Sequence, residues 1–112
     1  MQVGIDMVKV SRIKEAIEKN ENFKEKVFTL KEIEYCEKKK NKYESYAARF
    51  AAKEALAKAL GTGFRNLRFK DIEIENDILG KPKINYKDFN IKVSLSHERE
   101  YAIAIAIIEG DD

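Results

Sequence analysis

The segment Tyr43–Leu60 constrains the fold of this chain more than any other stretch. It is rich in alanine and contains neither glycine nor proline, so we predict one uninterrupted helix. Gly61-Thr62-Gly63 follows at once, and Gly61 is a residue suited to closing a helix in the left-handed conformation. Alanines recur every four residues at Ala47, Ala51 and Ala55, which leaves little side-chain bulk on that stripe. Another backbone can therefore approach this helix closely.

Shorter helices are predicted before this segment. Ser11 is placed to cap a helix that runs to about Lys19, with Ile13, Ala16 and Ile17 on its apolar stripe. Asn22–Val27 predicts a short helical piece. Thr29-Leu30-Lys31-Glu32 has the pattern of a capping box, and the helix that it begins should turn Ile33 and Cys36 inward.

The predicted strands lie at the two ends of the chain. Val3–Val10 is an apolar stretch with Asp6 at or near its end, and Phe69–Glu75 and Ile91–Ser96 alternate with period two. Leu79–Pro82 predicts a turn, and the apolar run Tyr101–Ile108 predicts a central strand buried on both faces. The order of one strand, several helices and three strands indicates an α+β fold, with helices packed on one side of a largely antiparallel sheet. We expect residues 1–112 to form a single domain.

Composition excludes several classes of protein. The net charge of +2 does not fit a strongly basic nucleic-acid binder. The longest apolar run, Ala102–Ile108, is too short to cross a bilayer, so we expect no membrane partner. Met1–Val10 lacks the pattern of a signal peptide, and the single cysteine, Cys36, cannot form an intrachain disulfide. These features favour a cytoplasmic protein.

The candidate chemistry is concentrated in Arg49–Lys58. On a helix, Phe50, Glu54 and Lys58 share one stripe. One interpretation is an ordinary surface pair between Glu54 and Lys58, worth about 0.2–0.5 kcal/mol. The second interpretation is a metal site. Asp6 is another carboxylate among apolar residues, and two half-buried carboxylates are costly without a cation. Mg²⁺ suits such a pair, because it is commonly held by one or two carboxylates, waters and substrate phosphates.

A phosphate substrate would also need cations and polar groups nearby. Arg49, Lys53 and Lys58 are candidates, although a solvated charge explains Lys53 equally well. His97, the only histidine, follows Ser94 and Ser96 at the end of a predicted strand, where a phosphate contact is plausible beside a structural role.

Blocks along nearly the whole chain resemble the holo-acyl-carrier-protein synthases, the small 4′-phosphopantetheinyl transferases. Gly4-Ile5-Asp6-Met7-Val8 resembles their N-terminal motif, and Arg49–Ala55 with Lys58–Gly63 resembles their signature helix and its end. The remaining blocks follow in the family order: Asp71-Ile72-Glu73-Ile74, Gly80-Lys81-Pro82 and Val93-Ser94-Leu95-Ser96-His97.

The resemblance implies an activity and a site. The family transfers the 4′-phosphopantetheine arm of coenzyme A to a serine of apo acyl-carrier protein, a step in fatty acid synthesis, and releases adenosine 3′,5′-bisphosphate. Mg²⁺ is its cofactor, and the matching positions make Asp6 and Glu54 the ligands, with Lys58 near the pyrophosphate. Arg49, His97 and the turn Gly80-Lys81-Pro82 match positions near the coenzyme A pocket, and Lys53 is a further candidate for coenzyme A binding. The family is typically a homotrimer with active sites between subunits.

One departure concerns Lys9, where many relatives carry an acidic residue. A third carboxylate from this strand is therefore not expected, and water would fill that position. Lys9 and Arg12 are the expected docking residues for an acidic carrier protein, with Lys14 and Lys19 beside them. The alternative is a solvated helix face, because Glu15 and Glu18 are interspersed.

Two points stay open at the level of sequence. The serine proton could go to Glu54 or to a metal-bound water. An alternative function is a small oligomeric nucleotide-binding module without catalysis, although the mixed charge speaks against it. A transferase that serves carriers of polyketide or peptide synthesis is a further alternative, but those enzymes are usually longer.

Overall fold

The computed structural model describes residues 1–65 and 67–110 of the chain. Strand β1 (Gln2–Lys9) is followed by four helices, α1 (Val10–Lys19), α2 (Phe23–Val27), α3 (Leu30–Glu37) and α4 (Lys42–Leu60). A short 3-10 helix, η1 (Phe69–Asp71), leads into β2 (Glu73–Asn76), β3 (Pro82–Asn85), β4 (Asn90–His97) and β5 (Tyr101–Glu109). Within the described part of the chain, no helix has the length and apolar character needed to cross a membrane.

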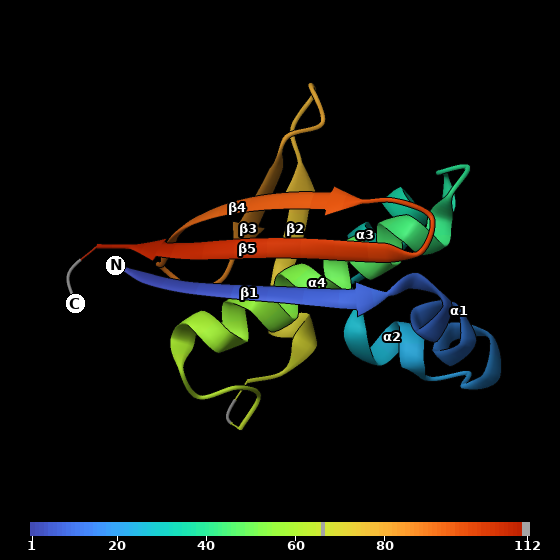
Figure 1. Ribbon diagram of the computed structural model, residues 1–112, viewed down its shortest axis with the longest axis horizontal. Helices are drawn as coiled ribbons and strands as arrows, with labels where there is room; N and C mark the ends of the chain where they lie inside the picture. Colours follow the sequence, from blue (N-terminus) through green and yellow to red (C-terminus); the bar gives the residue numbers. More distant parts are fainter. Residues whose placement is uncertain (66, 111–112) are drawn as a thin grey trace.

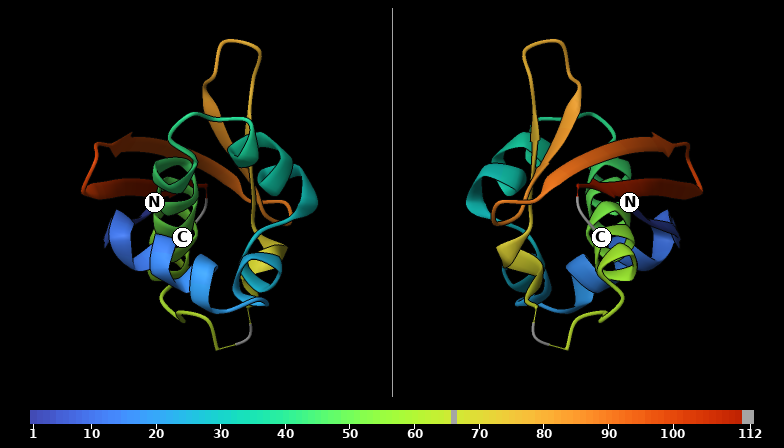
Figure 2. Two further views of the ribbon diagram at one scale, coloured as in Figure 1. Left: turned by 90° about the vertical axis from the view of Figure 1, so that its right-hand side faces the viewer. Right: turned by 90° about the vertical axis from the view of Figure 1, so that its left-hand side faces the viewer.

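The main sheet is antiparallel and has the strand order β1-β5-β4, so β5 is central as predicted. Helix α4 crosses one face of this sheet, and α1 and α2 lie beyond the end where β1 finishes (Figure 1). Strands β2 and β3 pair in a separate hairpin that projects away from the body of the molecule (Figure 2). This arrangement confirms the predicted α+β fold.

Strand β1 packs unusually closely against α4. A Cβ atom added at Gly4 would lie 2.0 Å from the carbonyl oxygen of Ala55, a distance that no side chain can tolerate. Ala47, Ala51 and Ala55 are fully buried, which confirms that the alanine stripe admits a neighbouring backbone. Glycine on the strand and alanine on the helix together bring Asp6 beside the helix that carries Glu54.

The prediction that β5 is buried on both faces is wrong for the single chain. Ala102, Ala104 and Ala106 are buried on the side of α4, whereas Tyr101 and Ile103 are exposed on the other side. The physical reason is that the helices cover only one face of the sheet. The uncovered face also carries exposed apolar residues of β1, namely Val3, Ile5 and Met7.

Several element boundaries differ from the predicted ones. Helix α1 begins at Val10, and its N-cap is Lys9 without a side-chain hydrogen bond, so Ser11 is not the cap. Asp6 lies within β1, where it pairs with Ala104 of β5, rather than at the strand end. In contrast, the capping box of Thr29 and Glu32 and the left-handed Gly61 are confirmed.

The segment Phe69–Glu75 is not one strand. It divides into η1 and the start of β2, and β3 follows the turn, so four strands instead of three come after the helices. Ile72 and Ile74 are both buried, so the sequence has the period-two pattern of a longer strand although only part of the segment is a strand. The Leu79–Pro82 turn is confirmed, since Gly80 joins β2 to β3 with φ of 89°.

Candidate functional site

Two carboxylates meet on one side of α4. Asp6 of β1 and Glu54 of α4 line the same cavity, whose wall also includes Arg12, Phe23 and Phe50. Burial raises the pKa of Glu54, and the nearby charge of Asp6 raises it further. The two carboxylates are therefore close enough to repel each other, and a cation between them would relieve that repulsion.

Lys58 stands beside this pair. Its ammonium donates hydrogen bonds to Asp6 Oδ1 at 3.0 Å and to the carbonyl oxygen of Ile5 at 3.1 Å. Asp6 is only 14% exposed, whereas the Lys58 side chain is 56% exposed. Lys58 thus connects α4 to β1 through Asp6 and the Ile5 backbone, with its ammonium still accessible to a bound anion.

The donor set fits magnesium held partly by a substrate. Among the described residues there is no group of three or more histidine, cysteine or acidic side chains that could enclose a metal ion. Two carboxylates are a common protein contribution to a Mg²⁺ site, since waters and phosphate oxygens complete the shell. That Asp6 and Glu54 share one ion stays a prediction.

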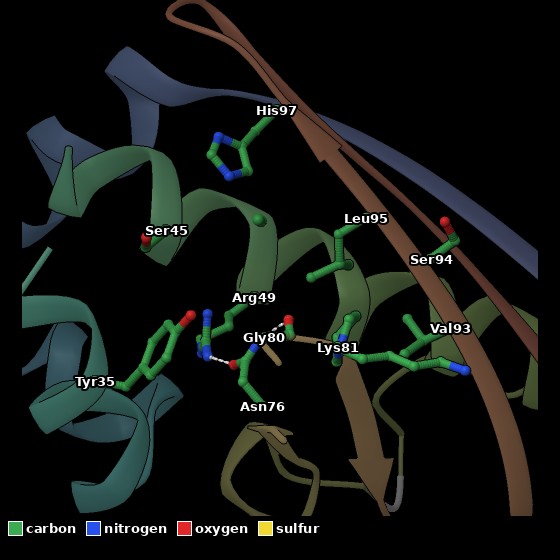
Figure 3. A pocket seen from close by; sticks show the side chains of 12 residues that line it. Tyr35, Ser45, Arg49, Asn76, Gly80, Lys81, Val93, Ser94, Leu95 and His97 are labelled. Carbon is green, nitrogen blue, oxygen red and sulfur yellow. Dashed lines mark hydrogen bonds between the residues drawn. The ribbon is translucent and has the colours of Figure 1, made fainter. Parts of the chain in front are cut away.

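A second cavity lies between α3, α4, the β2–β3 hairpin and β4 (Figure 3). It brings together five of the residues predicted to bind coenzyme A, from three separate segments: Arg49, Gly80, Lys81, Pro82 and His97. Its wall also contains residues that sequence reasoning missed, namely Tyr35, Ser45, Asn76 and Ser94.

Arg49 is the central cation of this second cavity. The side chain is almost fully buried, with its guanidinium 4.1 Å from the centroid of the Tyr35 ring. Its Nη2 donates a hydrogen bond to Asn76 Oδ1, and its Nε has no hydrogen-bond partner within the described part of the chain. A buried guanidinium with a spare donor is suited to an anionic ligand such as a phosphate.

His97 borders the same cavity at the end of β4, and Glu44 at the start of α4 is its partner. His97 Nδ1 lies 2.9 Å from Glu44 Oε1. Glu44, which was not a candidate, can therefore orient the imidazole. The position of His97 at the cavity agrees with a ligand contact, which stays a prediction.

Lys53 is not at either cavity wall, and its assignment to coenzyme A binding is wrong. The side chain is fully buried, and its ammonium lies 2.7 Å from Glu32 Oε1. It also donates to the carbonyl oxygens of Val27 and Phe69 at 2.6 and 3.0 Å. All three ammonium hydrogens have acceptors, so Lys53 forms a structural ion pair and has no access to a bound phosphate.

The predicted docking residues for a carrier are both exposed. Lys9 ends β1, and Arg12 lies on α1 at the rim of the carboxylate cavity. The position of Arg12 agrees with a partner that approaches the Asp6 and Glu54 side of the molecule, whereas Lys9 shares the other face of β1 with Met7. Docking at either residue stays a prediction.

The two cavities lie on different flanks of α4. Arg49 and Glu54 are five residues apart, which separates their side chains by about 140° around a helix. In the sheet, Asp6 belongs to the edge strand β1 and His97 to the opposite edge strand β4, with β5 between them. Neither cavity alone combines the carboxylate pair with the buried arginine.

Comparison with known proteins identifies relatives over the whole chain. A model of the 4′-phosphopantetheinyl transferase superfamily matches residues 2–106. A holo-[acyl-carrier-protein] synthase of Clostridium tetani is 52% identical, over 97% of this chain and 95% of the relative. Another, from Ruminiclostridium cellulolyticum, is 53% identical over 100% of this chain and 94% of the relative.

Solved structures agree in fold. The holo-(acyl-carrier-protein) synthase of Bacillus anthracis, in complex with CoA (3′,5′-ADP), matches with a TM-score of 0.88 and 36% identity, covering 98% of this chain and 96% of that one. The Helicobacter pylori synthase, in complex with coenzyme A, matches with a TM-score of 0.87 and 31% identity, covering 96% and 99%.

Proposed function

The chain belongs to the 4′-phosphopantetheinyl transferase superfamily, and we propose that it transfers the 4′-phosphopantetheine arm of coenzyme A to a serine of apo acyl-carrier protein. It thus acts as a holo-[acyl-carrier-protein] synthase, as its relatives are named. The observation that carries this proposal is the convergence of Arg49, the Gly80–Pro82 turn and His97 on one cavity. Similar folds hold coenzyme A in solved complexes, which supports the same ligand here.

The proposed reaction is a displacement at phosphorus. The serine oxygen of the carrier bonds to the β-phosphorus of coenzyme A, and the bond from that phosphorus to the bridging oxygen breaks. The bridging oxygen leaves with adenosine 3′,5′-bisphosphate, and the serine proton passes to a base. Such reactions depend on positioning and on neutralising charge. The Lys58 ammonium is placed to balance charge on the pyrophosphate, while Arg49 and His97 hold the nucleotide end.

Asp6 and Glu54 are the proposed magnesium ligands. Burial, and then the nearby charge of Asp6, raise the pKa of Glu54, and a divalent cation between the two carboxylates would relieve both costs. Mg²⁺, when bound there, would neutralise pyrophosphate oxygens as charge develops on them. Both side chains come from rigid elements, β1 and α4, which fixes where the cation can sit.

We further propose that the working form is a homotrimer. The uncovered face of the main sheet carries a row of apolar residues that a second copy could cover. Because the carboxylate cavity and the arginine cavity lie on different flanks of α4, assembly would join one half-site from each of two neighbouring copies. Each copy then contributes residues 1–112 as one transferase domain, acting in the cytoplasm in fatty acid synthesis.

Carrier docking is proposed at Lys9 and Arg12, since both are exposed cations and Arg12 lies at the rim of the carboxylate cavity. Arg12→Glu should raise the KM for acyl-carrier protein strongly and leave the KM for coenzyme A nearly unchanged, because reversed charge at a docking rim acts on the partner. Steady-state kinetics with each substrate varied in turn would measure this. Lys26→Glu, an exposed change on α2, is the control. Unchanged carrier kinetics in Arg12→Glu would remove Arg12 from the docking surface.

Mass spectrometry of the carrier tests the proposed function. Apo acyl-carrier protein is incubated with the chain, coenzyme A and Mg²⁺, and then its intact mass is measured. The expected result is a mass gain equal to phosphopantetheine that disappears when the metal is chelated. No gain on any of several acyl-carrier proteins, under conditions in which the chain is folded, would contradict the proposal.

A further inference from the structure

A buried ion pair lies one layer below the arginine cavity. Glu32 is only 1% exposed, yet its carboxylate has three hydrogen-bond donors from three elements. Oε1 accepts from the Thr29 backbone at 2.8 Å and from the Lys53 ammonium at 2.7 Å, and Oε2 accepts from the Ile74 backbone at 2.8 Å. One carboxylate thereby connects the start of α3, the middle of α4 and strand β2.

The same three elements form the contact that shapes the cavity. Tyr35 lies three residues after Glu32 on α3, Arg49 lies four residues before Lys53 on α4, and Asn76 lies two residues after Ile74 on β2. The Arg49 guanidinium packs on the Tyr35 ring and donates to Asn76 Oδ1, as Figure 3 shows. The contacts of Arg49 and the contacts of Glu32 thus join the same three elements, about one helical turn apart.

The connection continues to the turn that closes the cavity. Asn76 Nδ2 donates to the carbonyl oxygen of Gly80 at 2.9 Å, so the position of β2 also fixes the Gly80–Pro82 turn. A shift of β2 against α4 would move Asn76 and Gly80 together. It would also remove the hydrogen bond that orients Arg49.

We propose that Glu32 is a positioning residue for the coenzyme A site. Through Lys53 and the Ile74 backbone it sets α3, α4 and β2 in register, so that Tyr35, Asn76 and the Gly80 turn hold Arg49 in position for the nucleotide phosphates. This inference rests on the proposed function, since it concerns the ligand of the same cavity. A simple stabilising role is the alternative, but buried ion pairs are often no more stabilising than apolar residues of similar volume.

The test uses Glu32→Gln, with adenosine 3′,5′-bisphosphate as the probe in calorimetric titration and with steady-state kinetics. We expect nucleotide binding to weaken roughly ten-fold or more, because small misplacements of a positioning group have large effects. The KM for coenzyme A should rise by a similar factor, while the KM for the carrier stays unchanged. A purely structural role would lower the fraction of folded enzyme without this difference between the two substrates.

Glu37→Gln is the matched control. Glu37 is also a carboxylate of α3 that contacts α4, through Tyr46 at 2.6 Å and Lys42 at 3.2 Å, but it lies outside the contacts with β2. Its replacement should leave nucleotide binding within roughly twofold of the parent, as expected for independent sites. When Asn76→Ala is already present, adding Glu32→Gln should weaken nucleotide binding by a further factor of roughly two or less, because both changes act through one contact.

The outcomes separate the two proposals. Absence of nucleotide binding and of transfer in the unmodified chain would overturn the proposed function, and this inference with it. Normal binding by the parent and equal binding by Glu32→Gln would overturn only the positioning role. If Glu32→Gln does not fold, the double variant Glu32→Met/Lys53→Met decides, since apolar replacement of both partners commonly preserves folding. Weakened nucleotide binding in that variant supports the role, and unchanged binding rejects it.

Discussion

At the scale of single residues, the contact between Lys58 and Asp6 defines one half of the site. The two side chains meet at 3.0 Å although they are 52 positions apart in the sequence. Asp6 is largely shielded and has a fixed position, while the ammonium of Lys58 keeps access to solvent. This arrangement agrees with the proposal that the aspartate holds a metal ion and the lysine faces a phosphate group of the substrate.

Glu54→Gln should abolish metal-dependent transfer while the chain stays folded and assembled, since the amide keeps the shape of the side chain. The loss should exceed roughly 100-fold, because even groups that only support a metal ligand contribute about 10–100-fold. Carrier modification followed by mass spectrometry measures the rate, and light scattering checks assembly. Substantial activity in this variant would remove Glu54 as a ligand. Glu15→Gln, an exposed change on α1, is the control.

Glu37 should give the chain a pH-dependent stability in acid. The hydrogen bond from Tyr46 is the main reason that the pKa of Glu37 falls from 4.5 to about 2, and Lys42 and Lys24 lower it further. A lowered pKa in the folded state means that the stabilisation is complete above pH 4.5 and disappears as the pH falls toward 2. Urea unfolding of the parent and of Glu37→Gln between these values measures it. The two curves should converge in acid; a constant difference would contradict this origin.

Sequence alone could place the charged residues on α4 but could not separate their roles. Lys53 and Lys58 are of the same type on the same helix, yet one pairs with buried Glu32 and the other with Asp6 at the surface. These partners lie 21 and 52 positions away, so no local pattern distinguishes them. Tyr35 and Asn76 were missed for the same reason, because only the fold brings them to Arg49.

At the scale of elements, the contact between β1 and α4 positions the two carboxylates that we propose as metal ligands. Gly4 leaves space for the backbone at Ala55, and Asp6 follows two residues later on the same face of the strand. Any larger residue at position 4 would push the strand away from the helix. The distance between the Asp6 and Glu54 carboxylates therefore depends on a residue that carries no side chain.

Gly4→Ala should destabilise the fold by about 3 kcal/mol, the upper end of the usual range for overpacking, because the added methyl group meets backbone atoms that cannot move aside cheaply. Denaturant unfolding measures this change, and calorimetric titration should show weaker Mg²⁺ binding in any folded fraction. Gln2→Ala, an exposed polar position on the same strand, is the control. Parent-like stability in Gly4→Ala would contradict the close packing.

The accuracy of the predicted elements depended on the strength of their local pattern. Helix α4 and strands β4 and β5 have long, regular patterns and were predicted nearly to their ends. Strand β3 was missed because its four residues, Pro82–Asn85, contain only one buried apolar side chain, Ile84. The capping box at Thr29 was recognised because its chemistry is local, whereas the second function of Glu32 as the partner of Lys53 is not.

At the scale of the whole molecule, the uncovered sheet face and the two separate cavities have one common explanation. A face that exposes Val3, Ile5, Met7 and Ile103 is costly in water and would be covered in an assembly. A carboxylate half-site and a nucleotide half-site on different flanks of α4 could complete each other between neighbouring copies. Under the proposed function, the complete active site therefore forms only in the assembly.

Mixed assemblies of two inactive variants test this account most directly. Glu54→Gln disables the carboxylate half-site, and Lys81→Ala/His97→Ala disables the nucleotide half-site; each variant alone should be inactive. Co-expressed with different tags and purified through both, they should form mixed trimers in which about one site of three combines two intact halves. The mixed trimers should modify apo acyl-carrier protein at roughly a third of the parent rate, as measured by the intact mass of the carrier. Mixed trimers that stay as inactive as either variant would contradict an active site shared between copies.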